Sequence, residues 1–361
     1  MRRARRLTLA APPPDPFGER RRAALRARLQ LLGGRFEFES DSARLMRIVR
    51  HAYASLAPQR LGRRVPRFRI RLALTPGTAR RGRSGEPPPV RPLAGAQLLC
   101  GALDGGSFVS LAPRQRAALL VVSQDLMRHA YHVRYELLEF AVYVLAARAQ
   151  ALVPLHAACV GRRGEGVLLI GASGAGKSTL VLHCLLAGLD LLAEDSVLVR
   201  PAGLRASGVP SFLHLRPDSL RFLGRTARGG VRRRATLIRR RSGVTKLEID
   251  LRGSRPFGAA RGRLACGALK LGAVVFVSAR HSADDALLVP LARPTVLARL
   301  AASQRYAATQ PGWRQFRSRV ARLPAYELRR GSHPRVAAAA LAALLGPPRP
   351  AGQRRRIKMR K

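Results

Sequence analysis

A single glycine-rich run constrains the fold of this chain more than any other feature. Residues 171–179 read GASGAGKST and fit the pattern G-x-x-x-x-G-K-[ST] at every fixed position. In such a loop the backbone N–H groups, together with the N-terminus of the following helix, surround a phosphate group. An apolar run, VLLI (167–170), precedes the loop, and LVLHCLLAGL (180–189) follows it. The sequence therefore predicts a strand buried on both faces, a phosphate-binding loop and a helix, in that order.

We expect this loop to bind the phosphates of ATP. Lys177 would reach the β- and γ-phosphates, and the Ser178 hydroxyl would bind Mg²⁺. A glycine-rich turn with an incidental lysine is the alternative reading. The predicted phosphate-binding residues are Gly171, Ala172, Ser173, Gly174, Ala175, Gly176, Lys177, Ser178 and Thr179.

Two adjacent acids supply the next candidate residues. Glu194 and Asp195 stand 17 and 18 residues after Lys177, behind the strand-like run DLLA. Because neighbouring side chains of an extended segment point to opposite sides, we expect the two acids to have different roles. One of the two acids would serve the metal ion, and the other would accept the proton of an attacking hydroxyl. A solvated turn is the alternative.

The run 155–199 resembles the catalytic core of HPr kinase/phosphorylase, and is nearest to the HPr-kinase-related proteins. His156 stands 15 residues before Gly171, where that family has a histidine, and Glu194 and Asp195 fall on its two acids. The resemblance implies an α/β fold, with a P-loop kinase core of the HPr kinase / PEP carboxykinase-like type. It also implies that Glu194 is the base that activates a serine hydroxyl and that Asp195 is a metal ligand together with Ser178. His156 is then a catalytic residue beside the acid pair.

The sequence departs from that family at several positions. Glu194 replaces an aspartate, Ala157 follows the histidine instead of glycine, and Thr179 stands where the family has glutamate. The stretch 246–253 only partly matches the family's Glu-Ile-Arg-Gly segment. These departures favour ATP binding over phosphorylase activity.

Periodicity and composition divide the chain into four parts. Residues 1–34 are a basic Arg/Pro-rich segment with a predicted helix over 19–32, and residues 347–361 are a basic tail. Residues 35–151 are predicted to form a smaller α+β domain, and residues 152–346 the P-loop domain. Within these we expect strands at 35–40, 66–74, 107–113, 152–160, 190–199, 246–252 and 271–279, helices at 42–56 and 123–151, loops at 75–95 and 225–241, and mainly helix over 294–346.

The net charge is large, but its composition argues against a nucleic-acid partner. Basic residues outnumber acidic residues 67 to 20, for a formal charge of +47, yet only five of the basic residues are lysines. Aromatic residues, which stack on bases, make up 5% of the chain. We interpret the arginines as a solubilising surface. Because arginine is used almost everywhere, we expect that an interior lysine marks a position that needs a compact ammonium group. Lys246 is accordingly expected near the nucleotide, and Lys270 on the surface.

The four cysteines, at positions 100, 159, 184 and 266, show no paired spacing, which favours a reducing cytoplasm. No apolar run approaches the roughly 18 residues of a membrane span, and the N-terminus lacks the apolar core of a secretory signal.

The sequence therefore predicts a cytoplasmic, Mg-ATP-dependent kinase that phosphorylates a serine hydroxyl on a protein or peptide. An HPr-like protein and a small precursor peptide are both candidate substrates. The alternatives are a nucleotide-binding regulator that has lost phosphoryl transfer, a P-loop ATPase and, less favoured, a nucleic-acid-binding protein. The sequence leaves homo-oligomerisation open.

Overall fold

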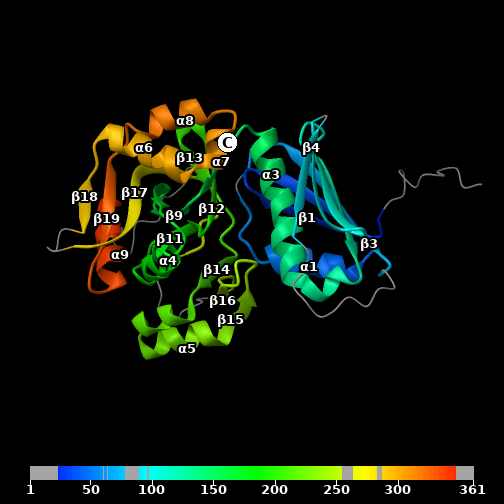
Figure 1. The fold of residues 1–361 in the computed structure, drawn as a ribbon, viewed down its shortest axis with the longest axis horizontal. Helices are drawn as coiled ribbons and strands as arrows, with labels where there is room; N and C mark the ends of the chain where they lie inside the picture. Colours follow the sequence, from blue (N-terminus) through cyan, green and yellow to red (C-terminus); the bar gives the residue numbers. More distant parts are fainter. Residues whose placement is uncertain are drawn as a thin grey trace, which may run out of the picture.

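The computed structural model describes residues 23–59, 61–62, 64–77, 89–95, 97–253, 263–282 and 287–346. These residues form a mixed α/β structure with two large sheets, each covered by its own helices, and a third, small sheet (Figure 1). The predicted basic tail, most of the N-terminal segment and part of the predicted loop 75–95 lie outside the described residues. In the described part of the chain, no helix is long and apolar enough to cross a membrane.

The first sheet has seven strands in the order β1-β2-β3-β7-β6-β5-β4, and α1 and α3 pack on one of its faces (Figure 1). Leu45, Ile48, Val49, Ala52 and Tyr53 are buried on α1 as predicted, and Ser42 caps that helix by accepting a hydrogen bond from the Leu45 N–H. The elements are β1 (Leu25–Leu31), β2 (Gly34–Ser40), α1 (Ala43–Tyr53), β3 (Arg67–Thr75), β4 (Arg91–Gly95), β5 (Leu98–Asp104), β6 (Ser107–Ala112), β7 (Ala117–Ser123), η1 (Leu126–His129), α2 (Ala130–His132), the π-helix η2 (Val133–Glu139) and α3 (Phe140–Ala149).

The helix predicted over 19–32 is wrong in its described part, because residues 25–31 form β1 and pair with β2. Apolar residues alternate along LRARLQL, while Arg26 and Arg28 on the other face lie 3.6 Å and 3.0 Å from carboxylate oxygens of Glu39 and Glu37. Cross-strand pairing thus outweighs the helical propensity of this arginine-rich run. The predicted boundary after residue 34 consequently falls inside the first sheet.

Two further predictions are corrected for the first unit, by which we mean the first sheet and its helices, β1 to α3. The predicted helix 123–151 is helical over 126–149, but it is divided into η1, α2, η2 and α3. The predicted loop 75–95 ends in a strand, β4, which pairs with β5.

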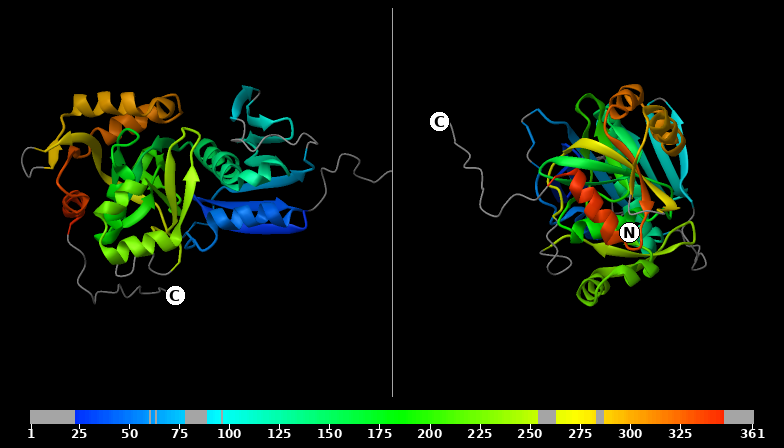
Figure 2. Two further views of the ribbon diagram at one scale, coloured as in Figure 1. Left: turned by 60° about the horizontal axis from the view of Figure 1, so that its bottom comes forward. Right: turned by 90° about the vertical axis from the view of Figure 1, so that its left-hand side faces the viewer.

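The second sheet has nine strands and carries helices on both faces (Figures 1 and 2). The helices α4 and α9 pack on one face, and α6, α7 and α8 pack on the other. The elements are β8 (Val153–His156), β9 (Ala158–Arg162), β10 (Glu165–Ile170), α4 (Lys177–Leu186), β11 (Asp190–Ala193), β12 (Ser196–Arg200), η3 (Pro201–Gly203), β13 (Arg205–Ser207), β14 (Phe212–Leu215), η4 (Pro217–Phe222), α5 (Arg225–Arg234), β15 (Ala235–Arg239), β16 (Thr245–Asp250), β17 (Leu269–His281), β18 (Leu288–Pro290), α6 (Arg293–Ser303), α7 (Arg305–Ala308), α8 (Trp313–Val320), β19 (Ala325–Arg330) and α9 (Pro334–Leu344).

The strand before the glycine-rich loop is buried on both faces, as its apolar sequence predicts. β10 lies between β9 and β17, and Val167 and Leu169 pack with α4 while Leu168 and Ile170 pack on the opposite face. Burial of this kind fixes the direction in which the chain leaves the strand at Ile170.

The predicted strands 152–160 and 190–199 are each two strands separated by a bend. Ala157 separates β8 from β9, and Glu194 and Asp195 separate β11 from β12. β9 pairs with β11 and β8 pairs with β12, and both pairs are antiparallel. The Ala157 N–H donates to the Asp195 carbonyl over 3.2 Å, so the two bends face each other.

The arginine-rich run 225–241 was predicted as a loop, but it contains α5 and β15, and β15 joins β14 and β16 in the small sheet. Several of its arginines make internal contacts; the Arg234 guanidinium, for example, donates to the Arg252 carbonyl over 2.8 Å. The region 294–346 is mainly helical as predicted, although it also contains β19, which pairs with β17.

A close approach at Gly208 supports the bend that carries the two acids. A Cβ at this position would lie 2.5 Å from the Ala193 Cβ and 2.6 Å from the Leu192 carbonyl oxygen. Gly208→Ala should therefore destabilise the protein by about 1–3 kcal/mol, as overpacking does, and lower Tm by several degrees in thermal unfolding. Gly272→Ala is the matched control, because a Cβ at Gly272 meets nothing within 4 Å. Equal Tm values for the two variants would contradict this account of the bend.

Candidate functional site

The glycine-rich loop connects β10 to α4, and two of its glycines hold left-handed backbone. Gly174 and Gly176 have φ values of +83° and +97°, a region that side chains disfavour. A Cβ at Gly171 would lie 2.9 Å from the Val277 carbonyl oxygen, so this position also requires glycine. The loop geometry therefore accounts for the three glycines.

Lys177 is the first residue of α4, and its ammonium group turns back into the loop. Its Nζ donates to the carbonyl oxygens of Gly171 and Ala172 over 2.5 Å and 3.2 Å. Burial lowers the pKa of Lys177, while the nearby carboxylates of Asp195 and Glu194 act in the opposite direction. The loop thus encloses a cation close to two acids.

Ser178 and Glu194 are in direct contact: the Ser178 hydroxyl donates to Oε1 of the Glu194 carboxylate. Glu194 is buried, with 6% of its side chain exposed, and its second oxygen, Oε2, lies 3.2 Å from Nδ1 of His214. The next residue along α4, Thr179, makes a 2.9 Å hydrogen bond with the Ser219 hydroxyl and thereby connects the helix to η4. The hydroxyl expected to bind a metal therefore touches the first acid of the pair.

A series of contacts between charged side chains extends from Glu194 to the helical segment 126–149, which packs on the first sheet. Nε2 of His214 lies 3.0 Å from Oε2 of Glu248, and the same oxygen accepts a hydrogen bond from the guanidinium of Arg134. Arg134 belongs to the π-helix η2 and also donates to Oε1 of Glu139 over 3.0 Å. The order of contacts is thus Ser178, Glu194, His214, Glu248, Arg134 and Glu139.

The charge state of His214 follows from its two partners. Both ring nitrogens face carboxylate oxygens, so both must donate, and only the protonated ring can do this. Burial by itself lowers the pKa of His214, but hydrogen bonds to Glu194 and Glu248 raise the pKa above its ordinary value. Burial in turn raises the pKa of Glu194, but His214, Ser178 and Lys246 together lower it below its ordinary value.

Further cations approach the loop from the small sheet and its connection. Arg216 follows β14, and its Nη2 lies 3.5 Å from the position of a Cβ at Gly174. Lys246 is on β16, and its pKa is lowered by burial and by Arg240, with Glu194 and Asp195 acting in the opposite direction. Lys270, by contrast, is exposed on β17. Lys270 is thus a surface residue as predicted, while the position of Lys246 relative to a nucleotide stays a prediction.

Asp195 lies on the more open side of the bend. Its Oδ1 is 3.2 Å from Nδ1 of His156, and 31% of the Asp195 side chain and 53% of the His156 side chain are exposed. The backbone of His156 is fixed by Gln304, whose amide accepts from the His156 N–H over 2.9 Å and donates to its carbonyl over 3.0 Å. Asp195 can therefore be reached from solvent, while Glu194 faces the interior.

The structure brings together the predicted loop, Ser178, both acids and His156. Glu194 contacts Ser178 and is buried, whereas Asp195 contacts His156 and is 31% exposed; the roles of the two acids stay predictions. Sequence reasoning missed His214 and Arg134 and gave Glu248 no role. The available signal was His214 inside the apolar run FLHL and Glu248 between two apolar residues, Leu247 and Ile249; their strands pair His214 directly with Glu248.

The described residues contain no group of three or more His, Cys, Asp or Glu side chains that could hold a metal ion by themselves. The adjoining hydroxyl of Ser178 and carboxylate of Glu194 nevertheless fit Mg²⁺. This ion prefers oxygen ligands and is commonly held by one or two carboxylates together with substrate phosphates.

Comparison with known protein families and with curated proteins finds no match for this chain. Among solved structures, the chain is similar to the HPr(Ser) kinase/phosphatase from Coxiella burnetii, at 13% sequence identity and a TM-score of 0.26. The match covers 53% of this chain and 87% of that chain. This likeness is a distant one.

The protonated state of His214 can be tested through stability. Since the pKa of His214 is raised in the folded state, its contribution is complete below the ordinary histidine value of about 6.5 and is lost as pH rises through the folded-state pKa. Removing one partner of a buried ion pair costs about 3–5 kcal/mol. We expect the difference in unfolding free energy between wild type and His214→Gln to be of that order at pH 6 and to shrink toward pH 9.

The measurement is urea unfolding at several pH values, with His281→Gln, at an exposed position, as the control. A difference that stays constant from pH 6 to pH 9 would show that His214 is not charged in the folded protein.

Proposed function

We propose that this protein binds Mg-ATP at the glycine-rich loop and transfers the γ-phosphoryl group to a hydroxyl on a protein or peptide. The observation that carries the proposal is the contact of Ser178 with buried Glu194, directly beside the accessible pair Asp195 and His156. Phosphoryl transfer needs a metal-binding side and an acceptor side next to each other, and the two adjacent acids face these two sides.

The positive groups around the loop support phosphate binding. Lys177 and the first N–H groups of α4 would contact the phosphates, and Arg216 and Lys246 add charge from the other side of the loop. Lys177 donates to the carbonyl oxygens of Gly171 and Ala172, and we expect a phosphate oxygen bound in the loop to accept from the same ammonium group.

Ser178 and Glu194 would hold Mg²⁺ together with phosphate oxygens. When bound, the ion neutralises negative charge on the phosphates as it builds up during transfer. The series His214, Glu248 and Arg134 keeps Glu194 ionised and fixed, so that its Oε1 stays directed at Ser178.

Asp195 is proposed as the base. Its carboxylate accepts the proton of the acceptor hydroxyl while the hydroxyl oxygen bonds to the γ-phosphorus and the bond from that phosphorus to the ADP oxygen breaks. His156 holds the Asp195 carboxylate on this side of the bend. The resemblance of residues 155–199 to HPr kinase/phosphorylase favours serine as the acceptor, and the exposure of Asp195 and His156 suits an acceptor on a macromolecule.

Nucleotide binding is tested with Lys177→Ala and, as matched control, Lys270→Ala. Loss of one charge-assisted hydrogen bond costs about 1.5–3 kcal/mol, so we expect ATP affinity to fall at least about tenfold in Lys177→Ala. Lys270→Ala should bind as wild type does, because Lys270 is exposed and pairs with Glu165 at the end of β10 that lies away from the loop. Calorimetric titration with Mg-ATP measures both, and equal affinities would remove the loop as the nucleotide site.

The division of roles between the acids is tested with Asp195→Asn and Glu194→Gln. Asp195→Asn should lower phosphoryl transfer about 10²–10⁴-fold and leave Mg-ATP affinity nearly unchanged, since it removes only the base. Glu194→Gln should weaken Mg-ATP binding and raise the Mg²⁺ concentration needed for activity.

Transfer is followed with γ-labelled ATP and candidate protein or peptide acceptors. If Glu194→Gln instead lowered the transfer rate without changing Mg-ATP affinity, and Asp195→Asn weakened Mg-ATP binding, Glu194 would be the base. ATP hydrolysis without transfer to any acceptor would favour a P-loop ATPase, and binding without turnover would favour a nucleotide-binding regulator.

A further inference from the structure

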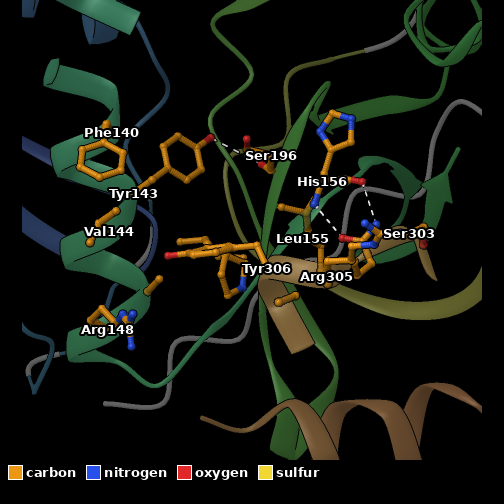
Figure 3. A pocket seen from close by; sticks show the side chains of 16 residues that line it. Phe140, Tyr143, Val144, Arg148, Leu155, His156, Ser196, Ser303, Arg305 and Tyr306 are labelled. Carbon is orange, nitrogen blue, oxygen red and sulfur yellow. Dashed lines mark hydrogen bonds between the residues drawn. The ribbon is translucent and has the colours of Figure 1, made fainter. Parts of the chain in front are cut away.

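A pocket of about 290 Å³ lies between α3 of the first unit and the strands β8 and β12 and helix α7 of the second. Figure 3 shows Phe140, Tyr143 and Val144 on one side, and Leu155 and His156 on the other, with the Tyr306 ring between them. Its volume is at the lower end of the range for small-molecule sites, which is about 300–1,000 Å³. It therefore suits one large side chain better than a whole cofactor.

The pocket presents aromatic surface to solvent. Phe140 is 39% exposed and Tyr306 is 58% exposed, although large apolar side chains are usually buried. Tyr143 is fixed at the rear by a hydrogen bond from its hydroxyl to the Ser196 carbonyl, 3.5 Å away. Partly exposed aromatic rings in the lining of an apolar cavity are typical of a binding site for another aromatic or aliphatic group.

The pocket is continuous with the acceptor side of the candidate site. His156 lines it, and Nδ1 of the same ring lies 3.2 Å from the Asp195 carboxylate. His156 therefore belongs both to the lining of the pocket and to the accessible side of the candidate site.

The strand at this pocket is closed to pairing with another strand. β8 is at the end of the sheet order, but Pro154 has no N–H group and Gln304 already bonds the N–H and carbonyl of His156. These features are typical of a protected sheet edge. Recognition here must consequently use a side chain in the pocket and not a β-strand added to β8.

The charged side chains that line the pocket indicate the charge of its ligand. Arg148 on α3 and Arg305 on α7 both line the pocket and are exposed, and neither has an ion-pair partner among the described residues. The chain as a whole carries a formal charge of +47. An acidic ligand is therefore favoured by both the local and the overall charge.

We infer that this pocket binds an aromatic or large aliphatic side chain of an acidic peptide, next to the hydroxyl that accepts phosphate. The inference rests on the proposed function for the acceptor, but binding of the peptide does not depend on phosphoryl transfer. Arg148 and Arg305 contact acidic residues on either side of the anchoring side chain.

The probe is a fluorescein-labelled peptide with one serine, a tryptophan two residues away and four flanking acidic residues. Two matched peptides replace the tryptophan by alanine or the four acidic residues by lysine. Anisotropy without nucleotide measures affinity for the full chain. The tryptophan peptide should bind at least about tenfold more tightly than each matched peptide.

Tyr306→Ala, Phe140→Ala and the charge reversals Arg148→Glu and Arg305→Glu should each weaken the acidic tryptophan peptide several-fold. Leu93→Ala, at a side chain 66% exposed on β4, and Arg44→Glu, exposed on α1, are the controls and should bind as wild type does. Tm is measured alongside; it should change little for Tyr306→Ala and the two arginine variants, and should fall modestly for Phe140→Ala, whose side chain is only 39% exposed.

Equal affinity for the three peptides, no binding of any of them, or unchanged affinity in all four pocket variants would overturn the inference. Free indole binding as tightly as the peptide would also overturn it, in favour of a small-molecule pocket. Tight, pocket-dependent peptide binding without phosphate transfer would instead contradict the proposed function and leave the peptide site standing.

Discussion

The hydrogen-bonded imidazolium of His214 between Glu194 and Glu248 is the interaction on which the candidate site depends. An isolated carboxylate in the interior would take up a proton, but His214 bonds one oxygen of each acid and keeps both ionised. Glu194 consequently retains a charged oxygen for Ser178. Buried ionic groups of this kind add little net stability, yet removing one member is costly, so the series fixes geometry more than it stabilises the fold.

The same series makes the first unit part of the site. Arg134 lies in a π-helix, a form that often occurs at functional sites, and its guanidinium reaches Glu248, 114 residues further along the chain. Other contacts fix the same junction: the Ser211 hydroxyl donates to the Ala52 carbonyl over 2.8 Å, and Arg252 donates to the Ala54 carbonyl over 3.3 Å. The pocket beside α3 and the glycine-rich loop before α4, for which we propose peptide and nucleotide binding, are thus connected through these contacts.

Sequence reasoning succeeded where the signal is local and failed where it depends on distant pairing. The glycine-rich loop between a doubly buried strand and a helix is encoded within about twenty residues, and the periodicity of α1 is equally self-contained. β1 was predicted as a helix. The alternation of apolar and arginine side chains along this run favours a strand only once the arginines are known to face carboxylates of β2. His214 and Arg134 could not be grouped with Glu194 because only the small sheet and the π-helix bring them together.

The glutamate at position 194, where the resembling family has aspartate, acquires a physical explanation from these contacts. Oε1 of the Glu194 carboxylate accepts a hydrogen bond from the Ser178 hydroxyl, and Oε2 lies 3.2 Å from Nδ1 of His214. An aspartate, shorter by one methylene group, would have to give up one of these contacts. The additional methylene group of glutamate therefore allows one carboxylate to contact both Ser178 and His214. The carboxylate of Asp195, which we propose as the base, takes part in neither contact and lies 3.2 Å from His156 instead.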